Sequence, residues 1–533
     1  MKMNNFMATV LLFVTCFAAH AAAKAPLHPV RGGVAAFAVQ SCVPPAYGTG
    51  EDYAAPDGSL FTHASAVQFP QEGEMLYEVA VNGKYVGLYT DNSHWGGLVH
   101  FGSFEFAGGK EITVDINYAH EIKSFEILPK TLELKAIRKT SSRSLSLKLR
   151  KADQNITLIV NGEPKKDVLH LFAASIDRNA PEVPAGTGFR RFDERKLIYF
   201  GPGYYDLEKL TGSDVLQIPD GWQVYIAAGA VVYGRFDAWN AGPGTSLCGR
   251  GMVYNDARTP RMIFTVTESR GMRVEGLIFH THLPRCWQVG VTRCRDIVFE
   301  NVKILSTRYA STDGLDVINS SDCRFANMFI RANDDAVAVK GLQSGKPEDC
   351  LPNRNLVFEH MQLWNDCNNA FGLGAETRAS VYENIQLRNS CVLFSYDDPD
   401  NHEKLDERSA LTICCLEGTF FRNILYENID VYHCERLVAE GFKPDFWFGS
   451  IQGNQTTAGG IDGVTFRNVS SFASSGSSIA NQIHLYGWRQ DGTPDKYVEN
   501  VTFENLRIEG RKVKSADDSH FLVDSMVKGI VFR

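Results

Sequence analysis

Two parts of the chain differ in the rhythm of their apolar positions. Between about residues 74 and 174, apolar and polar residues alternate, as in "EITVDI" (111–116), "LSLKL" (145–149) and "ITLIV" (156–160). A period of two places one face of a strand in a core and the other in solvent. Turn signals such as Asn161-Gly162 separate these segments. The pattern predicts an N-terminal antiparallel β-sandwich over residues 26–175.

After a Pro- and Gly-containing linker over residues 176–195, a short β-rich phrase recurs, often ending in asparagine. A unit of this length cannot bury its own face and must stack on its neighbours, which predicts a right-handed parallel β-helix over residues 196–533. The polar residue of each phrase is expected to stack on its copy in the next coil. The aligned positions are Gly276, Asn301, Asn327, His360, Asn384, Asn428, Asn468 and Asn505.

Composition and targeting signals limit the classes of function. The formal net charge is -8 and no basic patch stands out, so nucleic acid is not expected as a partner. Lys2 precedes a short apolar run and small residues, which predicts a signal peptide over residues 1–23 and a secreted or periplasmic protein. A lipid anchor at Cys16 fits the sequence poorly, and no later segment is predicted to span a membrane. The 12 cysteines are scattered and are expected to be buried thiols.

Four aspartates in the predicted β-helix fall at a spacing that brings them together. Asp313 and Asp316 lie in "STDGLD", and Asp334 and Asp335 begin "DDAVAVKG". Because Asp334 follows Asp313 by 21 positions, nearly one coil, we expect Asp313 and the later pair to lie side by side on one exterior face. Crowded carboxylates suit glycoside hydrolysis, in which one acid protonates the leaving oxygen and another activates water. A calcium site or a structural ladder is the alternative, although the rhythm of a calcium loop is absent.

At these residues the chain resembles the inverting β-helix glycosidases, the group that contains the polygalacturonases of family 28 and the dextranases and isopullulanases of family 49. The two motifs correspond to N-T-D-G-x-D and D-D-C-x-A-x-K-S-G of polygalacturonases. The resemblance covers most of residues 197–510 and implies Asp334 as the general acid, with Asp313 and Asp335 activating water. The N-terminal segment, with "YEVAVNGKYVGLY", resembles the β-sandwich of the second family.

The chain departs from the polygalacturonase pattern where that family reads a uronate. Asn369 stands in place of a cleft histidine, and "ALTICC" from Ala410 replaces a stretch with two cations. A cleft without that clamp has lost a feature suited to a negative sugar ring. Lys340 and Arg378 are the cations expected to reach the cleft. A neutral, dextran-like glycan is therefore slightly preferred, and a pectin-type substrate stays open.

Several further residues are expected to contact the substrate. Asp316, Lys340 and Asn369 adjoin the catalytic aspartates, and Glu376 and Arg378 follow a Gly-x-Gly segment. Trp287 lies before the catalytic coils, where its ring could stack on a sugar or pack in the core. Weaker candidates for sugar contact, and a loop expected as a cleft wall, lie elsewhere in the domain: Trp364, Trp447 and residues 397–407.

The sequence thus predicts an exported inverting glycoside hydrolase that cleaves a polysaccharide or oligosaccharide with three aspartates and without a cofactor or metal. One alternative is a β-helix polysaccharide lyase, which would need calcium and an Arg or Lys base. Another is a non-catalytic carbohydrate-binding β-helix. Release of reducing sugar separates these functions. The oligomeric state and the role of the β-sandwich do not follow from the sequence.

Overall fold

The computed structural model describes residues 48–256, 261–282, 285–307, 310–397, 408–443, 445–446, 449–450, 454, 457–473 and 477–533. The predicted signal peptide, residue Trp447 and most of the loop 397–407 lie outside these residues. Among the described residues no helix is long and apolar enough to cross a bilayer. The described chain is almost entirely β-structure, with short helical turns at η1 (Asp193–Arg195), α2 (Leu207–Thr211) and η2 (Pro347–Asp349).

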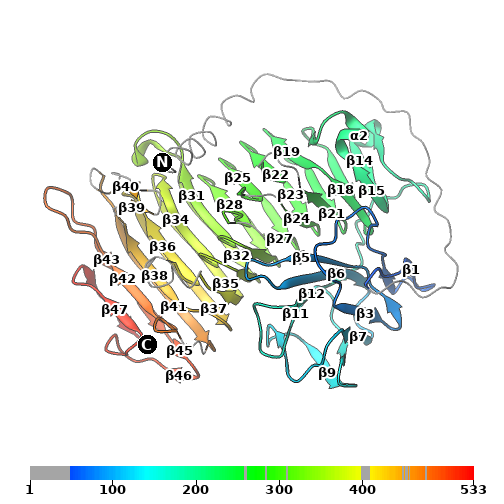
Figure 1. The fold of residues 1–533 in the computed structure, drawn as a ribbon. Coiled ribbons are helices and arrows are strands. Elements are labelled where there is room, and N and C mark those ends of the chain that lie inside the picture. The colour runs from blue at the N-terminus through cyan, green and yellow to red at the C-terminus, as the bar shows by residue number, and fades with distance from the viewer. Residues whose placement is uncertain are drawn as a thin grey trace, which may run out of the picture.

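The N-terminal part is a sandwich of two sheets, shown from blue to cyan in Figure 1. The first sheet contains β1 (Tyr53–Ala54), β2 (Leu60–Thr62), β6 (Leu98–Phe106), β12 (Val168–Ser175), β11 (Gln154–Val160) and β8 (Phe125–Leu128), with β5 (Leu88–Asn92) paired to β6. The second sheet contains β4 (Lys84–Tyr85), β3 (Tyr77–Val81), β7 (Ile112–Tyr118), β10 (Ser144–Leu149) and β9 (Leu134–Lys139). The sheets are antiparallel as predicted, except that β12 pairs with β6 in parallel.

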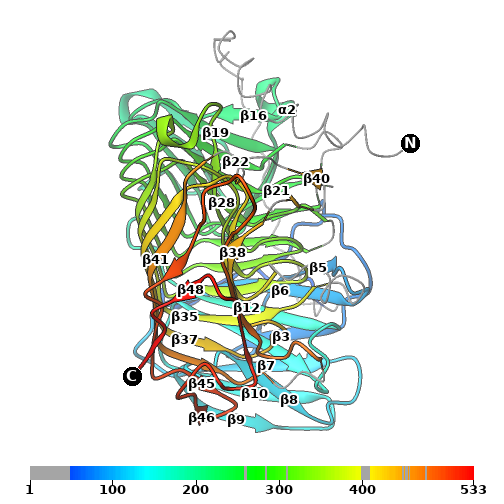
Figure 2. The ribbon, with the colours of Figure 1, turned by 90° about the vertical axis from the view of Figure 1, so that its left-hand side faces the viewer.

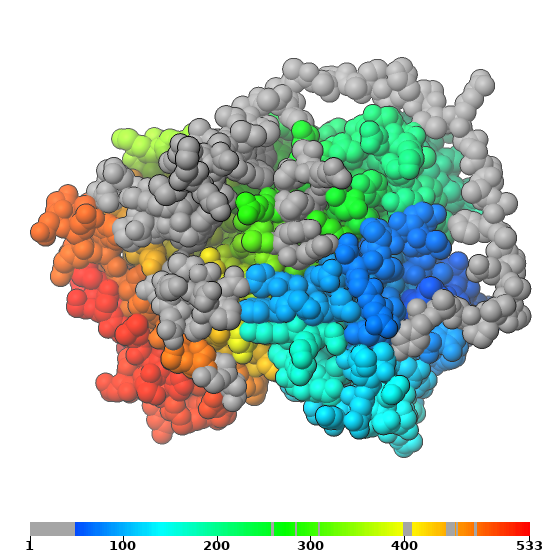
Figure 3. Space-filling view, viewed as in Figure 1, coloured from blue at the N-terminus to red at the C-terminus, as the bar shows by residue number. Residues whose placement is uncertain are grey.

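The predicted alternation holds in one sheet and fails in the other for a physical reason. Strands β7 and β10 bury every second residue. In contrast, β11 is buried along its whole length, because its outer face packs on the β-helix. Ile159 and Phe172 join one apolar cluster with Phe329 and Trp364 of the β-helix. The space-filling view shows the blue and cyan sandwich directly against the green part of the β-helix (Figure 3).

The remaining chain forms stacked coils of a parallel β-helix, as predicted, and Figure 2 shows them one behind another. One sheet, the site sheet, contains β16 (Val215–Gln217), β19 (Arg235–Trp239), β22 (Phe264–Thr267), β25 (Val289–Thr292), β28 (Leu315–Ile318), β31 (Val337–Leu342), β34 (Phe371–Arg378), β36 (Leu411–Cys415), β38 (Val438–Phe442), β42 (Ile483–Tyr486) and β47 (Phe521–Val523). A two-stranded hairpin of β39 (Asp445–Phe446) and β40 (Gly449–Ser450) lies outside the coils.

The other faces of the coils form one continuous path, the long sheet. Its strands begin at Arg190, inside the predicted linker. They are β13 (Arg190–Phe192), β14 (Leu197–Phe200), β15 (Gly203–Asp206), β17 (Gln223–Ile226), β18 (Ala230–Tyr233), β20 (Ser246–Gly249), β21 (Met252–Asn255), β23 (Arg273–Glu275), β24 (Ile278–Thr281), β26 (Val298–Glu300), β27 (Lys303–Ser306), β29 (Arg324–Ala326), β30 (Phe329–Ala332), β32 (Asn353–Glu359), β33 (Gln362–Asn365), β35 (Tyr382–Ser395), β37 (Phe420–Val431), β41 (Gly460–Ser471), β43 (Val498–Glu499), β44 (Thr502–Glu504), β45 (Arg507–Ile508), β46 (Arg511–Lys512), β48 (Val527–Lys528) and β49 (Val531–Phe532).

Asparagines form ladders at the corners of the coils, where the backbone takes the left-handed conformation that asparagine tolerates. Asn468 donates to Asn428 at 2.9 Å, and Asn428 donates to Asn389 at 2.8 Å. The predicted alignment was wrong at one rung. Asn389 occupies the column of His360 and Asn428, because Glu359 pairs with Arg388, whereas Asn384 belongs to a second ladder. The segment "VYEN", which ends at Asn384, resembles the recurring phrase but lies five residues before Asn389, the true position in this column.

The cysteines in the described part of the chain are all free thiols, and all but Cys248 are buried. This agrees with their expected use as small core residues. Trp364, a weaker candidate for sugar contact, is fully buried at the contact with the sandwich. It stacks on Phe394 with ring centroids 4.7 Å apart, and its Nε1 donates to Asp366. A role for Trp364 in sugar binding is therefore excluded in this conformation.

Candidate active site

The acidic residues lie where the chain enters successive strands of the site sheet. Asp313 precedes β28, and Asp334 and Asp335 precede β31. The pairing of Leu315 with Val337 places Asp313 level with Asp335, beside the adjacent pair Asp334 and Asp335 as expected. The backbone confirms this register, because Gly314 N donates to Asp335 O at 2.8 Å. Neighbouring strands lie about 4.8 Å apart, so the carboxylates of adjacent coils form one cluster.

The carboxylates were expected on an exterior face, but most of them are buried. The exposed fraction is 2% for Asp313, 5% for Asp335 and 0% for Asp316, while Asp334 is partly exposed. Lys340 on β31 lies among them, with Nζ 2.6 Å from Asp313 Oδ2 and 3.2 Å from Asp316 Oδ1. A buried charge is costly unless it is paired, and this lysine provides the cation. Asp316 therefore contacts Lys340 and, being fully buried, cannot touch a substrate in this conformation.

Burial and mutual repulsion keep protons on part of the cluster. Burial and the neighbouring Asp334 carboxylate raise the pKa of Asp335 to about 7, although Lys340 and the hydrogen bonds from Asn369 oppose that rise. Burial raises the pKa of Asp316 to about 6 and that of Asp313 further, against the attraction of Lys340. Burial disfavours the charged form of Lys340, but the surrounding carboxylates raise its pKa well above the usual range. The lysine is therefore charged at neutral pH, and the carboxyl groups share the remaining protons.

Asp334 occupies the outer edge of the cluster and accepts hydrogen bonds from three N–H groups. Its Oδ2 accepts from Ser311 N at 2.9 Å. Its Oδ1 accepts from Asn368 Nδ2 at 2.5 Å and from Asp335 N at 3.0 Å. These contacts fix the orientation of the side chain while it remains partly exposed. Asp334 is thus the member of the adjacent pair that a substrate can reach.

Asn369 lies beneath the carboxylates and is a positioning residue in this conformation, where we had expected a substrate contact. Its Nδ2 donates to Asp335 Oδ1 at 2.9 Å, and its Oδ1 accepts from Ser409 N and Thr412 Oγ1. The side chain is 8% exposed. Its amide oxygen and nitrogen are satisfied by these protein groups, so Asn369 holds Asp335 in place. The pattern "NNAF" did not reveal which of the two asparagines faces outward.

Three other predicted contact residues lie around the cluster. Trp287 is partly exposed, and the Lys340 ammonium lies 3.6 Å from its ring centroid. Glu376 is partly exposed and close enough to raise the pKa of Lys340. Arg378 forms an ion pair with Glu417, with Nε 3.1 Å from Oε1. Trp287 and Glu376 therefore adjoin the carboxylates, whereas Arg378 is held by a carboxylate of the following coil.

Sequence reasoning missed two cations beside the cluster. A small pocket is lined by Asn368, Ser409, Arg408 and Arg436, together with acidic residues that include Asp397. Arg408 is paired with Asp397 at 2.6 Å, and Arg436 donates to the Arg408 carbonyl. The expectation that Lys340 and Arg378 are the cations near the cleft was therefore incomplete. The signal lies in the coil register, since Ser409 and Arg436 continue the column of Asp335 and Asn369.

A group of side chains with the spacing of metal ligands occurs elsewhere in the described part of the chain. It comprises Asp91, His280 and His282, and it contains none of the four aspartates of the cluster. The cluster itself already holds a cation in Lys340. Its arrangement of partly exposed and buried carboxyl groups can donate and accept protons on neighbouring atoms, which is the requirement of general acid–base chemistry.

Part of the chain matches a known protein family, and its fold is similar to that of known structures. Residues 210–392 match the family described as "Glycosyl hydrolases family 28". "Exopolygalacturonase B" of Aspergillus niger is 24% identical over 279 residues, covering 49% of this chain and 56% of the relative. The chain therefore spans little more than half the length of the curated relatives it matches.

Among solved structures, "Dex49A from Penicillium minioluteum" has a TM-score of 0.55 at 11% identity, covering 89% of this chain and 98% of that one. The "Family 28 Exopolygalacturonase" of Yersinia enterocolitica has a TM-score of 0.44 at 10% identity, covering 80% and 97% of the two chains. The Dex49A match supports the shared fold over both domains. With the family match, it confirms the predicted resemblance to the parallel β-helix glycoside hydrolases.

Proposed function

Since this chain is a parallel β-helix protein whose residues 210–392 match the family 28 glycosyl hydrolases, we propose that it is an inverting glycoside hydrolase of a polysaccharide or oligosaccharide. The observation that carries the proposal is the position of Asp313, Asp334 and Asp335 on adjacent coils, with one carboxyl partly exposed and two buried. Glycosidic cleavage needs two carboxyl groups in different environments.

The proposed division of roles follows accessibility. Asp334, at the outer edge, donates a proton to the leaving oxygen of the glycosidic bond. Asp313 and Asp335, held level on adjacent coils, accept a proton from the attacking water. In inverting enzymes the acid and the base are separated by about 6.5–9.5 Å to admit that water. A carboxyl with a pKa of about 7, such as that of Asp335, can take up a proton near neutral pH.

Lys340 and Asn369 support this arrangement without touching the reacting atoms. Lys340 compensates the charges of Asp313 and Asp316, which would otherwise remain buried and unpaired. Asn369 fixes Asp335 and, through Ser409 and Thr412, connects it to the next coil. Lys340 covers one face of the Trp287 ring, and because Trp287 is partly exposed we propose that a sugar stacks on the part of the ring that Lys340 leaves open. We propose Trp287 and Glu376 as the substrate contacts nearest the carboxylates.

The substrate is either a neutral glycan or a glycan that carries carboxylates. The residues that replace the uronate clamp of polygalacturonases favour a neutral glycan. The pocket with Arg408 and Arg436 gives a weaker argument for a glycan that carries carboxylates. Guanidinium groups bind carboxylates in a planar, paired geometry, but Arg408 is already paired with Asp397. Two curated relatives are named as exopolygalacturonases, one of them as probable. We therefore propose a pectin-type glycan as the second candidate beside a dextran-like one.

One assay tests the activity and both candidates. The purified protein is incubated with dextran, pullulan, polygalacturonate and rhamnogalacturonan, and reducing sugar is measured against the Asp334→Asn variant. The proposal expects release from at least one glycan by the native protein. A product that absorbs in the ultraviolet would instead indicate a lyase. Binding of a glycan without release of reducing sugar would support the carbohydrate-binding alternative.

A pair of substitutions separates the two substrates. Arg436→Gln removes a cation beside Asn368 and should raise KM for polygalacturonate while leaving a neutral glycan unaffected. Arg388→Gln is the matched control, because Arg388 pairs with Glu359 on the long sheet. If both substitutions raise KM for polygalacturonate equally, the overall charge of the protein, and not the pocket, determines its affinity for this substrate. We also propose that the protein is exported, which a processed N-terminus of the secreted protein would verify.

A further inference from the structure

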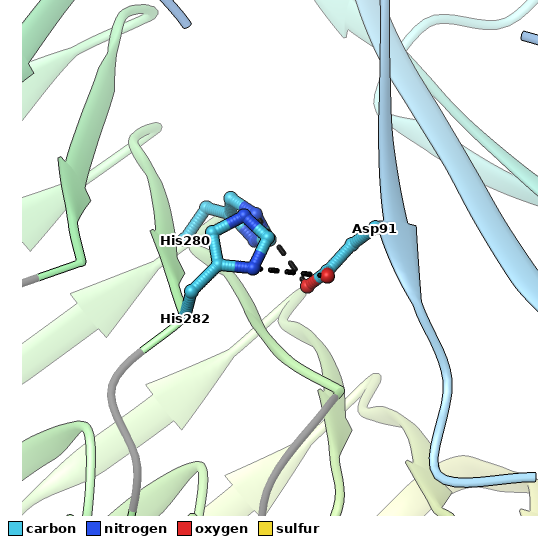
Figure 4. Close-up of side chains that lie close together, drawn as sticks. All are labelled: Asp91, His280 and His282. Atoms are coloured by element: carbon cyan, nitrogen blue, oxygen red, sulfur yellow. Dashed lines mark ion pairs between the residues drawn. The ribbon is translucent and has the colours of Figure 1, made fainter. Parts of the chain in front are cut away.

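Three buried side chains meet where the sandwich packs on the β-helix. Asp91 belongs to β5 of the sandwich, His280 lies on β24 of the long sheet, and His282 follows directly after that strand. One ligand atom from each lies within 4.8 Å of the other two. Figure 4 shows both imidazole rings turned toward the Asp91 carboxylate from the opposite side of the domain contact. Asp91 and His280 are fully buried, and His282 is 7% exposed.

The hydrogen bonding of His280 determines which of its ring nitrogens carries a proton. Its Nδ1 lies 3.2 Å from the carbonyl oxygen of Leu305, which can accept a hydrogen bond but cannot donate one. Nδ1 is therefore protonated, and the neutral ring directs the lone pair of Nε2 toward the cluster. That Nε2 lies 3.7 Å from Asp91 Oδ2. A lone pair that faces a buried carboxylate is stabilised when a cation lies between them.

His282 adds a second nitrogen without a hydrogen bond, its Nε2. The Nδ1 of this ring forms an ion pair with Asp91 Oδ1 at 3.0 Å, whereas Nε2 has no hydrogen-bond partner among the described residues. The same holds for Nε2 of His280. Buried polar atoms in proteins are nearly always satisfied. Two unsatisfied nitrogens beside one buried carboxylate therefore indicate a ligand.

The surroundings resemble the outer shell of a metal site. Thr307 Oγ1 lies 2.9 Å from Asp91 Oδ2 and holds the carboxylate, while the Leu305 carbonyl holds His280. Outer partners of this kind orient metal ligands. Phe69 and Tyr254 pack around the imidazoles with ring centroids 4.6 Å apart, so the site is enclosed by apolar groups. A single negative charge with two neutral imidazoles is a donor set that Zn²⁺ accepts.

We propose that Asp91, His280 and His282 bind one divalent transition-metal ion, with Zn²⁺ as the best fit, and that this ion joins the sandwich to the β-helix. Zn²⁺ bonds to histidine nitrogen and carboxylate oxygen are about 2.0–2.2 Å long, which separates tetrahedral ligands by about 3.3 Å. The observed separations of 3.0 Å and 3.7 Å lie on either side of that value. A fourth position is left for a ligand from outside this group.

The position of the ion gives it a structural role in the active site. His282 leads into the segment that carries Trp287, and Thr307 leads into the segment that carries Asp313. An ion bound to Asp91 would therefore hold His282 and Thr307, the residues from which these segments start, against the sandwich. It acts on positioning and stability, because none of its ligands is a residue that we assign to the reaction.

The test uses the full-length protein and three variants. The protein is stripped with a chelator, reloaded with Zn²⁺ or Co²⁺, and measured for bound metal, visible absorption and Tm. We expect one ion per chain, visible absorption of a tetrahedral Co²⁺ site, and a higher Tm in Zn²⁺. Asp91→Asn and His282→Ala should lose the absorption and the rise in Tm. Asp91→Asn keeps the shape of the side chain, and circular dichroism verifies that each variant is folded.

A second contact between the domains supplies the matched control. His433 and Glu126 also form a histidine–carboxylate pair across the contact, with Nε2 2.8 Å from Oε2, but among the described residues no third metal-ligating side chain joins them. His433→Ala should weaken the contact and leave the metal content unchanged. Absence of stoichiometric Zn²⁺ and Co²⁺ binding by the native protein would overturn the proposal. Equal loss of metal in His433→Ala and in His282→Ala would also overturn it, because binding would then depend on the contact alone.

Discussion

Asn369 donates two hydrogen bonds to the same oxygen of Asp335, from its backbone N at 3.0 Å and from its Nδ2 at 2.9 Å. The two residues occupy the same position on adjacent coils, so the register of the β-helix itself creates the contact. Hydrogen bonds to an ionised carboxylate favour the charged form. Asn369 therefore lowers a pKa that burial and Asp334 raise.

The first prediction concerns the pH dependence of Asn369→Ala. Losing the side-chain donor removes about 1.5–3 kcal/mol of stabilisation from the Asp335 carboxylate, which corresponds to about one to two pKa units. The pKa of Asp335 should rise further above 7, so the acidic limb of kcat/KM should move to higher pH. Asn428→Ala removes an exposed rung of the ladder and serves as the control. A profile that is unchanged in Asn369→Ala would contradict the assignment of Asp335 as a base.

The second prediction concerns the proton donor. Asp334→Asn keeps the size of the side chain and its exposure but cannot protonate a leaving oxygen. Turnover should fall by at least about 100-fold, the usual scale for general acid catalysis, while Tm stays close to that of the native protein. Steady-state rates on the active glycan, with thermal unfolding as the check of folding, measure this. Near-normal rates would remove Asp334 from the mechanism.

The third prediction concerns stereochemistry. If Asp313 and Asp335 activate water on the face opposite to the leaving group, the first product has the inverted anomeric configuration. Proton NMR during early turnover distinguishes this product before the anomers equilibrate. Retention of configuration, or a trapped glycosyl-enzyme, would mean that one aspartate acts as a nucleophile.

The fourth prediction concerns the dependence of stability on pH. Glu440 on β38 is fully buried and has no hydrogen-bond partner among the described residues, and burial raises its pKa to about 8. Its usual pKa of about 4.5 is expected in the unfolded chain. Because the folded state prefers the neutral acid, Glu440 favours folding fully below pH 4.5. This contribution should be lost as the pH rises toward 8, by about 1.4 kcal/mol per unit.

Glu440→Gln should remove this slope from the free energy of unfolding measured by denaturant titration between pH 5 and 8. Glu359 provides a control of opposite sign. Burial opposes its ionisation, but Arg324 and Arg388 lower its pKa overall. Glu359→Gln should therefore cost stability above its usual pKa and little in acid. The same slope in native protein and Glu440→Gln would show that Glu440 has a partner or solvent access.

Most of the fold could be predicted from the sequence because the apolar positions of both domains repeat at regular intervals. Alternation predicted β7 and β10, and the recurring phrases predicted stacked coils, since each depends on local burial. Burial on the outer face of β11 could not be predicted, because it depends on a contact with distant coils. The assignment of Asn384 in place of Asn389 failed for the same reason. Two corners of one coil have similar sequences, and only the strand pairing distinguishes them.

The candidate site was predictable where spacing equals one coil and unpredictable where long insertions intervene. Asp313 and Asp335 are separated by one coil, and their proximity followed from counting residues. Arg408 follows a long insertion, and Arg436 follows one coil later, so their place beside Asn368 required the register of β36 and β38. The ligands Asp91 and His280 lie in different domains and share no motif at all.

The apolar contact between the two domains makes the N-terminal sandwich a permanent part of the protein and not a detachable accessory module. Phe329 and Trp364 of the β-helix are covered by Ile159 and Phe172 of the sandwich. A truncated chain beginning at residue 190 would expose this aromatic surface to water, and exposed apolar patches of that kind drive aggregation.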